Sequence, residues 1–155
     1  MSETIDSFWQ SYLATLPPDH PHRVAAYTAW AFGDSSELAD ELAGLVCQGA
    51  KTGTAGLLWE YEFDDEPVPE PGELSVILDG SKTPVAVIET VAVEITPFNA
   101  VSAEHAYSEG EGDRSLADWR DGHWRFFTRS CTRIWRTPDE AMPIVCERFR
   151  LLFTA

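Results

Sequence analysis

SSELADELAGLVCQGAKTGTAGLLWEYEF, residues 35–63, carries the clearest signal of how this chain folds. Ser35 or Ser36 can cap the start of a helix, acidic residues lie in its early turns, and leucines recur at helical spacing. Gly49 can end that helix, because glycine readily adopts the left-handed conformation of a C-terminal cap. The following TAGLLWEYEF is rich in β-branched and aromatic residues, which predicts a strand over residues 54–63. The pattern therefore indicates a helix that runs through a short junction into a strand.

Further strand-like segments follow in the middle and at the end of the chain. They are ELSVILDG (residues 73–80), PVAVIETVAVEIT (residues 84–96) and IVCERFRLLF (residues 144–153), all rich in β-branched and aromatic residues. Asp79-Gly80 predicts a turn between the first two of these strands. Few strands with flanking helices favour an α+β fold built on a small barrel.

Helical patterns lie on both sides of these strands. Aromatic and apolar residues near the N-terminus follow helical spacing until Pro17-Pro18 ends the pattern, and residues 102–108 and 115–133 also look helical. We therefore predict an N-terminal helical extension over residues 1–22. The main domain then covers residues 23–155, packed with the extension as one globular unit.

Several features of the sequence bear on the cellular location of the protein. No segment reaches the roughly 20 apolar residues that cross a bilayer, and the N-terminal MSETIDSFWQ lacks the basic and apolar regions of a signal peptide. Three widely spaced cysteines favour reduced thiols over a disulfide framework. We therefore expect a cytoplasmic protein with no membrane partner, whose oligomeric state the sequence leaves undefined.

The net charge of −15 argues against general affinity for nucleic acids, because phosphates are repelled at long range. The charge is unevenly spread, however. Up to Asp113 there are three basic and 21 acidic residues, whereas from Arg114 onward eight arginines face five acidic residues. The arginine-rich end can attract a polyanion locally, or it can simply neutralise the acidic remainder of the fold.

Three of these arginines form a row on the predicted last helix. Arg125, Arg129 and Arg133 follow i, i+4, i+8 spacing and so share one helical face. We predict that this row tracks an RNA phosphate backbone, with neighbouring aromatic residues as stacking surfaces. The alternative is that the aromatic residues are core and that the arginines pair with Asp118, Asp121 or the acidic N-terminal helix.

The stretch GAKTGT, Gly49–Thr54, joins the predicted helix to the first strand, and here the chain resembles the ASCH family, whose G-x-K-x-x-T signature lies at this junction. Similar stretches are WAFGDSSELADELAGLV before the motif, GELSVILDG and PVAVIET after it, and the closing CERFRLLF. The insertion SAEHAYSEGEGDRSLADWRDGHWRFF resembles the larger bacterial subgroup of the family. The resemblance covers nearly the whole chain after about Arg23. It implies a small PUA-like mixed β-barrel with a central cleft.

The resemblance also implies RNA-linked roles, and hydrolysis for some members: ribonuclease activity, or amidohydrolase activity on N4-acetylcytidine. The residues of the amidohydrolase branch, carried over by motif, fall on Lys51, Thr54 and Glu109. Thr54 would be the nucleophile, Lys51 its base, and Glu109 would orient the cytosine amino group or shuttle its proton. The alternative interpretation makes Lys51 a solvated loop lysine and Thr54 an ordinary strand residue. This chain is longer than that branch, so its additions can alter the substrate.

RNA cleavage would require a different set of stabilising groups. Lys51 with an arginine, or a divalent ion such as Mn²⁺ or Mg²⁺, would stabilise the charge that develops on phosphorus. Glu109, Glu111 and Asp113 could hold such an ion, although a loop of solvated carboxylates is the commoner explanation. Amide hydrolysis, by contrast, requires no metal or other cofactor. Glu89 interrupts an otherwise apolar strand, and we expect it as a secondary residue of the cleft.

The leading hypothesis is therefore a hydrolase that recognises RNA or a modified nucleoside in its cleft. A non-catalytic RNA-binding module is the second hypothesis, weakened by the acidic charge of the first 113 residues. A third is an adaptor whose acidic face binds a basic protein.

Overall fold

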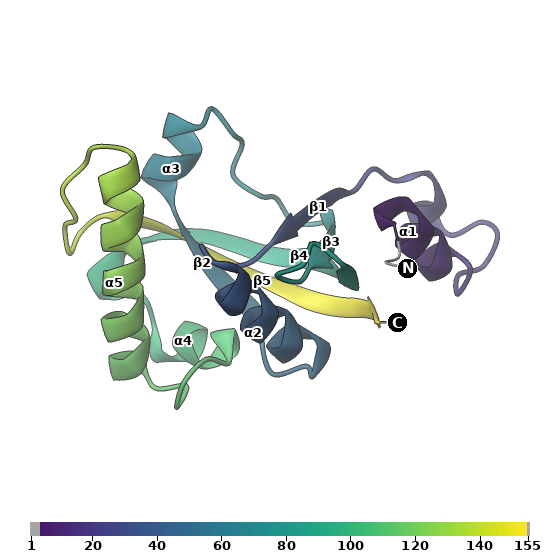
Figure 1. Cartoon of the computed structure of the whole chain (residues 1–155). Coiled ribbons are helices and arrows are strands. Elements are labelled where there is room, and N and C mark those ends of the chain that lie inside the picture. Colours follow the sequence, from purple (N-terminus) through teal and green to yellow (C-terminus); the bar gives the residue numbers. More distant parts are fainter. Residues whose placement is uncertain (1–3, 155) are drawn as a thin grey trace.

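A computed structural model describes residues 4–154 of the protein, which form a curled five-stranded mixed sheet with helices around it (Figure 1). The strands are β1 (Thr28–Ala31), β2 (Gly53–Leu57), β3 (Leu74–Leu78), β4 (Pro84–Pro97) and β5 (Pro143–Thr154). Their order in the sheet is β1-β3-β4-β5-β2. β1 and β3 are parallel, and the other neighbours are antiparallel. The sheet forms a half-barrel, with β1 and β2 as its two edges.

The helices are α1 (Ile5–Leu13), α2 (Ser36–Cys47), α3 (Leu58–Phe63), α4 (Ala103–Glu109) and α5 (Leu116–Arg133). Short 3-10 turns lie at Pro21–Val24 and Phe98–Ala100. Figure 1 shows α1 and α5 at opposite ends of the molecule. The predicted α+β fold with a PUA-like mixed sheet is confirmed. No helix in the described part of the chain combines the length and the apolar character needed to cross a membrane.

Helix α2 and the junction after it follow the sequence prediction. The Ser35 hydroxyl accepts a hydrogen bond of 3.1 Å from the Leu38 amide and so caps the helix. Gly49 has a φ of +79°, the left-handed conformation that ends the helix. Only three residues then separate Gly49 from the first residue of β2. The GAKTGT motif is thus held between two rigid elements.

The strand predicted over residues 54–63 is half wrong, because β2 ends at Leu57 and helix α3 begins at the next residue. The alternating apolar and acidic residues there looked like a strand. In the helix, however, Glu60 and Asp64 lie one turn apart and share a single partner, the Arg133 guanidinium, at 2.8 Å each. The packing of Trp59 against buried residues of β2, α5 and β5, together with these ion pairs, therefore overrides the local pattern.

The N-terminal extension shares the core of the sheet. Phe8 in α1 is fully buried and contacts Phe153 of β5 with ring centroids 5.3 Å apart. Trp9, Tyr12 and Leu13 are buried in the same cluster as residues of β3 and β4. The predicted division of the chain after residue 22 remains a prediction, but α1 is not a loose appendage.

Candidate functional site

The concave side of the sheet carries a groove with a volume of about 1070 Å³. It lies between the edge strands β1 and β2, and α3, α5 and the centre of the sheet complete its walls. Aromatic rings line it from several elements: Tyr27, Trp30, Phe32, Tyr61 and Phe126. A groove of this size is at the upper end of small-molecule sites. Its rings offer faces on which a nucleobase can stack.

The charged residues of the groove are mostly acidic. Its lining contains six carboxylates, Asp34, Glu60, Asp64, Glu66, Glu73 and Glu147, and two arginines, Arg129 and Arg133. Both arginines are already paired: the Arg129 Nε lies 2.7 Å from Asp34, and Arg133 binds Glu60 and Asp64. The groove therefore suits an uncharged aromatic ligand better than a phosphate backbone.

Lys51 is buried, with 2 % of its surface exposed, and its ammonium group lies among acidic side chains. Nζ donates to Glu111 Oε2 at 2.9 Å and lies 3.5 Å from Glu109 Oε1. It also lies 5.3 Å from the centroid of the Phe32 ring, which lines the groove. Among residues 4–154, those that line the groove include Thr54 but neither Lys51 nor Glu109.

The Glu109 carboxylate is enclosed by hydrogen-bond donors. Oε2 accepts from His105 Nε2 at 2.8 Å and from Trp119 Nε1 at 2.7 Å, and Oε1 lies 3.1 Å from His123 Nε2. Burial alone would raise the pKa of Glu109, but the Lys51 ammonium and the hydrogen bonds from both histidines hold that pKa well below its usual value. Glu109 is therefore a stable carboxylate anion.

His123 lies between two acceptors, which fixes its charge. Its Nδ1 contacts the Trp119 carbonyl oxygen at 2.9 Å, and its Nε2 faces the Glu109 carboxylate. Both nitrogens must carry hydrogen to satisfy both contacts, and that form is the imidazolium ion. Burial lowers the pKa of His123, but the hydrogen bond and the charge of Glu109 outweigh burial and raise it. Lys51, Glu109, Glu111 and His123 thus form a charge-balanced cluster.

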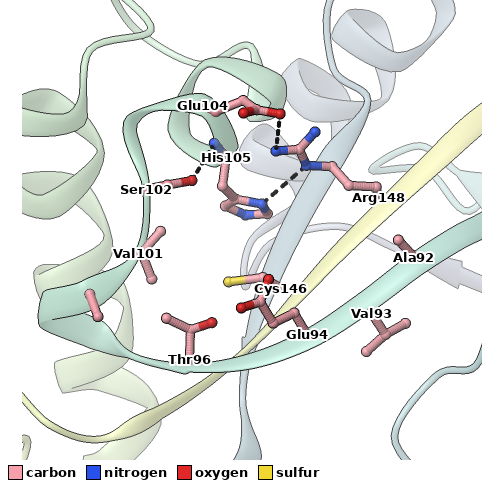
Figure 2. A pocket seen from close by; sticks show the side chains of 11 residues that line it. Ala92, Val93, Glu94, Thr96, Val101, Ser102, Glu104, His105, Cys146 and Arg148 are labelled. Atoms are coloured by element: carbon pink, nitrogen blue, oxygen red, sulfur yellow. Dashed lines mark hydrogen bonds and ion pairs between the residues drawn. The ribbon is translucent and has the colours of Figure 1, made fainter.

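A smaller pocket of about 330 Å³ lies on the other face of the sheet, between β4, β5 and α4. Figure 2 shows Arg148 and His105 side by side at its rim, with Cys146 below them. Arg148 Nε donates to His105 Nδ1 at 3.4 Å, which leaves His105 Nε2 to donate to Glu109. Burial raises the pKa of the Cys146 thiol to about 12, so this cysteine is a poor nucleophile.

Thr54 faces the groove from β2, and its direct cross-strand neighbour on β5 is Glu147. Glu147 is also part of the groove lining, although only 6 % of its surface is exposed. Its Oε2 accepts a hydrogen bond of 2.7 Å from the Thr90 hydroxyl. Burial raises the pKa of Glu147, and the charge of Glu73 adds to that effect.

The remaining predicted binding residues lie away from the groove. Glu89 shares a face of β4 with Val87, which packs in the α1 cluster, and its carboxylate pairs with Arg150. Its expected place in the cleft is therefore not observed. Arg125 is exposed and pairs with Asp121, one of the two helix neighbours predicted as partners. The arginine row exists, but each of its members has an intramolecular partner.

A divalent ion does not fit the acidic cluster as it stands. Donor atoms of Glu109, Glu111 and His123 lie within 4.8 Å of one another, which is close enough for metal ligands. However, the Lys51 ammonium binds both carboxylates, and His123 presents N–H rather than a lone pair. An ion there would meet two cations, the Lys51 ammonium and the His123 imidazolium.

Sequence reasoning did not identify His105, Trp119, His123 and Glu147 as parts of this region. One signal was present: Trp119 and His123 lie four residues apart on a predicted helix and so share a helical face, and His105 and Glu109 have the same spacing, with Glu109 one residue beyond the predicted helix 102–108. Glu147 lies between Cys146 and Arg148 in a predicted strand, and an acidic residue in that position is equally typical of a solvated face. Only the curl of the sheet places Glu147 in the groove.

Comparisons with known proteins agree with this geometry. The family model described as ASCH domain matches residues 28–152. An ASCH domain structure from Lactobacillus crispatus JV V101 is 31 % identical, with a TM-score of 0.89, and the match covers 95 % of this chain and 92 % of that one. A structure from Enterococcus faecalis V583 is 35 % identical, with a TM-score of 0.83, covering 95 % and 86 %. No curated protein matches the chain. The resemblance noted in the sequence is confirmed.

Proposed function

The chain belongs to the ASCH domain family, and from this premise we propose that its groove binds a nucleoside and that the protein hydrolyses the amide of an acylated nucleoside such as N4-acetylcytidine. ASCH domains are of a nucleic-acid-binding type thought to bind RNA. The observation that carries the narrower proposal is the lining of the groove. Aromatic rings combine there with six carboxylates and two paired arginines, which favours a neutral nucleoside over a polyanion.

The reaction centre is Thr54, the predicted catalytic residue that faces the groove. Its Oγ attacks the acyl carbonyl carbon, the carbon–nitrogen bond breaks to release the nucleoside amine, and water then hydrolyses the threonine ester. β2 is an edge strand of the described sheet, so part of its backbone N–H groups is not engaged by a neighbouring strand. Such groups can stabilise the oxyanion of the tetrahedral intermediate.

Lys51 and Glu109 do not line the groove, but their contacts help to position Thr54. Helix α4 is attached to the motif by the Lys51–Glu109 ion pair and by a 2.7 Å hydrogen bond from the Thr52 amide to the Ser108 carbonyl. These contacts fix the start of β2 and hence the position of Thr54. An ammonium group offers donors and no acceptor, so Lys51 in this arrangement contributes positive charge rather than a proton acceptor.

The experiment is incubation with N4-acetylcytidine and, separately, with single-stranded RNA, each with and without Mn²⁺, followed by product analysis. Equal amounts of cytidine and acetate, independent of Mn²⁺, would support the proposal. Intact acetylcytidine after long incubation would contradict it.

Ribonuclease activity or RNA binding alone is the second candidate. It is favoured by the position of Arg129 and Arg133 at the groove, where they could exchange their carboxylate partners for phosphates. Shortened RNA in the second arm of the experiment, with acetylcytidine untouched, would support this candidate instead.

A further inference from the structure

The proposed reaction lacks a proton acceptor for Thr54, because the Lys51 ammonium is turned into the buried cluster. The groove supplies another group. Thr54 and Glu147 are directly opposite each other on the antiparallel strands β2 and β5, and both line the groove. Directly opposed residues have Cβ atoms about 5 Å apart, within the reach of a glutamate side chain.

Among the contacts of residues 4–154, one oxygen of the Glu147 carboxyl group has a hydrogen-bond partner. Thr90 donates to Oε2 at 2.7 Å, and this bond orients the group while leaving Oε1 for a partner in the groove. The residue as a whole is buried, with 6 % of its surface exposed, and its neighbours at i−2 and i+2 along β5 are the buried apolar residues Val145 and Phe149. We propose that Glu147 is the general acid–base of the reaction, taking the proton of Thr54 and delivering it to the leaving amine. This inference rests on the proposed amide hydrolysis.

The proton and electron balance closes with water as the only further reactant. As the Thr54 Oγ–carbon bond forms, its proton passes to Glu147 Oε1. When the carbon–nitrogen bond breaks, the electron pair goes to the nitrogen, which takes the proton from Glu147. A water molecule then gives its proton to Glu147 while attacking the ester carbonyl. Cleavage of the carbon–Oγ bond returns that proton to Thr54 and releases the acid.

The electrostatic surroundings of Glu147 fit this role. The titratable groups that interact with it electrostatically are Tyr61 from α3, Glu73 ahead of β3 and, from the buried cluster, Lys51 ahead of β2. Burial and Glu73 raise the pKa of Glu147, while Thr90 and Lys51 act in the opposite direction. A carboxylate with a raised pKa is a stronger base than an exposed glutamate, as proton abstraction from a hydroxyl requires.

The test compares Glu147→Gln and Glu147→Asp with the wild-type protein on N4-acetylcytidine. The glutamine variant keeps the size and can still accept from Thr90, so we expect an unchanged fold and KM with kcat lowered roughly 10²- to 10⁴-fold. The aspartate variant retains a carboxyl group and should recover part of the rate. Glu94→Gln, which removes an exposed strand glutamate outside the groove lining, is the matched control and should keep nearly full activity.

The pH profile separates a catalytic from a structural role. In the wild type and in Glu94→Gln, kcat/KM should rise with pH through a limb above the ordinary glutamate value of 4.5, as Glu147 ionises. That limb should be missing from the residual rate of Glu147→Gln. A full rate or an unchanged limb in Glu147→Gln would overturn this inference alone. Absence of hydrolysis in the wild type would overturn the proposed function and this inference together.

Discussion

At the scale of the residue, the cluster around Glu109 shows why a buried charge can be tolerated. Its carboxylate accepts from three side chains and also faces the Lys51 ammonium, so its lost hydration is replaced by fixed donors. Removing one partner leaves the others uncompensated. The balance therefore makes each member of the cluster costly to change.

Replacing Lys51 by methionine should lower the free energy of unfolding by about 3 kcal/mol or more, because two carboxylates then lose their shared cation. The double variant Lys51→Met, Glu109→Gln should be less destabilised than the sum of the two single variants. Urea unfolding of the four proteins measures this. Strict additivity would show that the pair is not coupled.

The charges of Glu109 and His123 in this cluster predict that stability is lost both at low pH and at high pH. Glu109 has a pKa lowered from 4.5, so its stabilisation is present above that pH and is lost as pH falls through the lowered value. His123 has a pKa raised from 6.5, so its stabilisation is present below that pH and is lost as pH rises through the raised value. The stability difference between the wild type and Glu109→Gln should therefore be largest between pH 4.5 and 6.5.

Urea unfolding across a pH series measures that difference. Glu104→Gln is the control, because this glutamate is largely exposed on the same helix. A constant gap between the wild type and Glu109→Gln at all pH values would contradict the assigned charges.

The sequence predicted that Lys51 and Glu109 lie close together, but not that the Lys51 side chain points into the buried cluster. Lys51 and Glu109 came from the resemblance to the ASCH family, and the structure places the Lys51 Nζ 3.5 Å from Glu109 Oε1. The direction of the lysine depends on α4 and α5, whose histidines and tryptophan surround Glu109. Those contacts join residues far apart in sequence, and no local pattern encodes them.

Among the secondary-structure elements, helix α5 carries the arginine row, which was interpreted either as a phosphate-binding row or as a set of intramolecular ion pairs. Its pairs with Asp34, Glu60 and Asp64 attach the helix to the loop before α2 and to α3. Helix α3 was itself predicted as a strand, because its alternating side chains fit either structure until these long-range ion pairs are known. Local propensity is sufficient for α2, with its serine cap and Gly49, but not for α3.

Replacing Arg125, Arg129 and Arg133 together by glutamine should lower stability by about 1–2 kcal/mol, since exposed ion pairs contribute little each. RNA affinity and its salt dependence should change little if the row serves these pairs. Arg120→Gln, on the same helix, is the control. A large loss of RNA affinity with a flatter salt dependence would restore the phosphate-binding interpretation.

At the scale of the whole molecule, the chain combines a net charge of −15 with a single curled sheet whose faces are covered by helices. Helix α1 caps one end of the sheet although it lies outside the region matched by the family model. The overall charge opposes long-range attraction of RNA, whereas a neutral nucleoside is not repelled.

Phe8→Ala should lower the free energy of unfolding by about 3–5 kcal/mol, because the ring is fully buried against the sheet. If α1 folds as one unit with the rest, tryptophan fluorescence and far-ultraviolet circular dichroism should show one common transition, shifted in the variant. Two separate transitions, of which only one shifts, would indicate an independent extension.

The rate of N4-acetylcytidine hydrolysis by Thr54→Val shows whether Thr54 is the nucleophile of the proposed reaction. Valine matches threonine in shape but lacks the hydroxyl, so the nucleophile is removed while β2 keeps its backbone pairing with β5. Thr52→Val is the matched control, because this neighbouring threonine is exposed and its hydroxyl donates to the Ser108 carbonyl of α4. We predict that Thr54→Val loses nearly all activity while Thr52→Val keeps it, with both variants as folded as the wild type. Equal activity of Thr54→Val and the wild type would contradict the account.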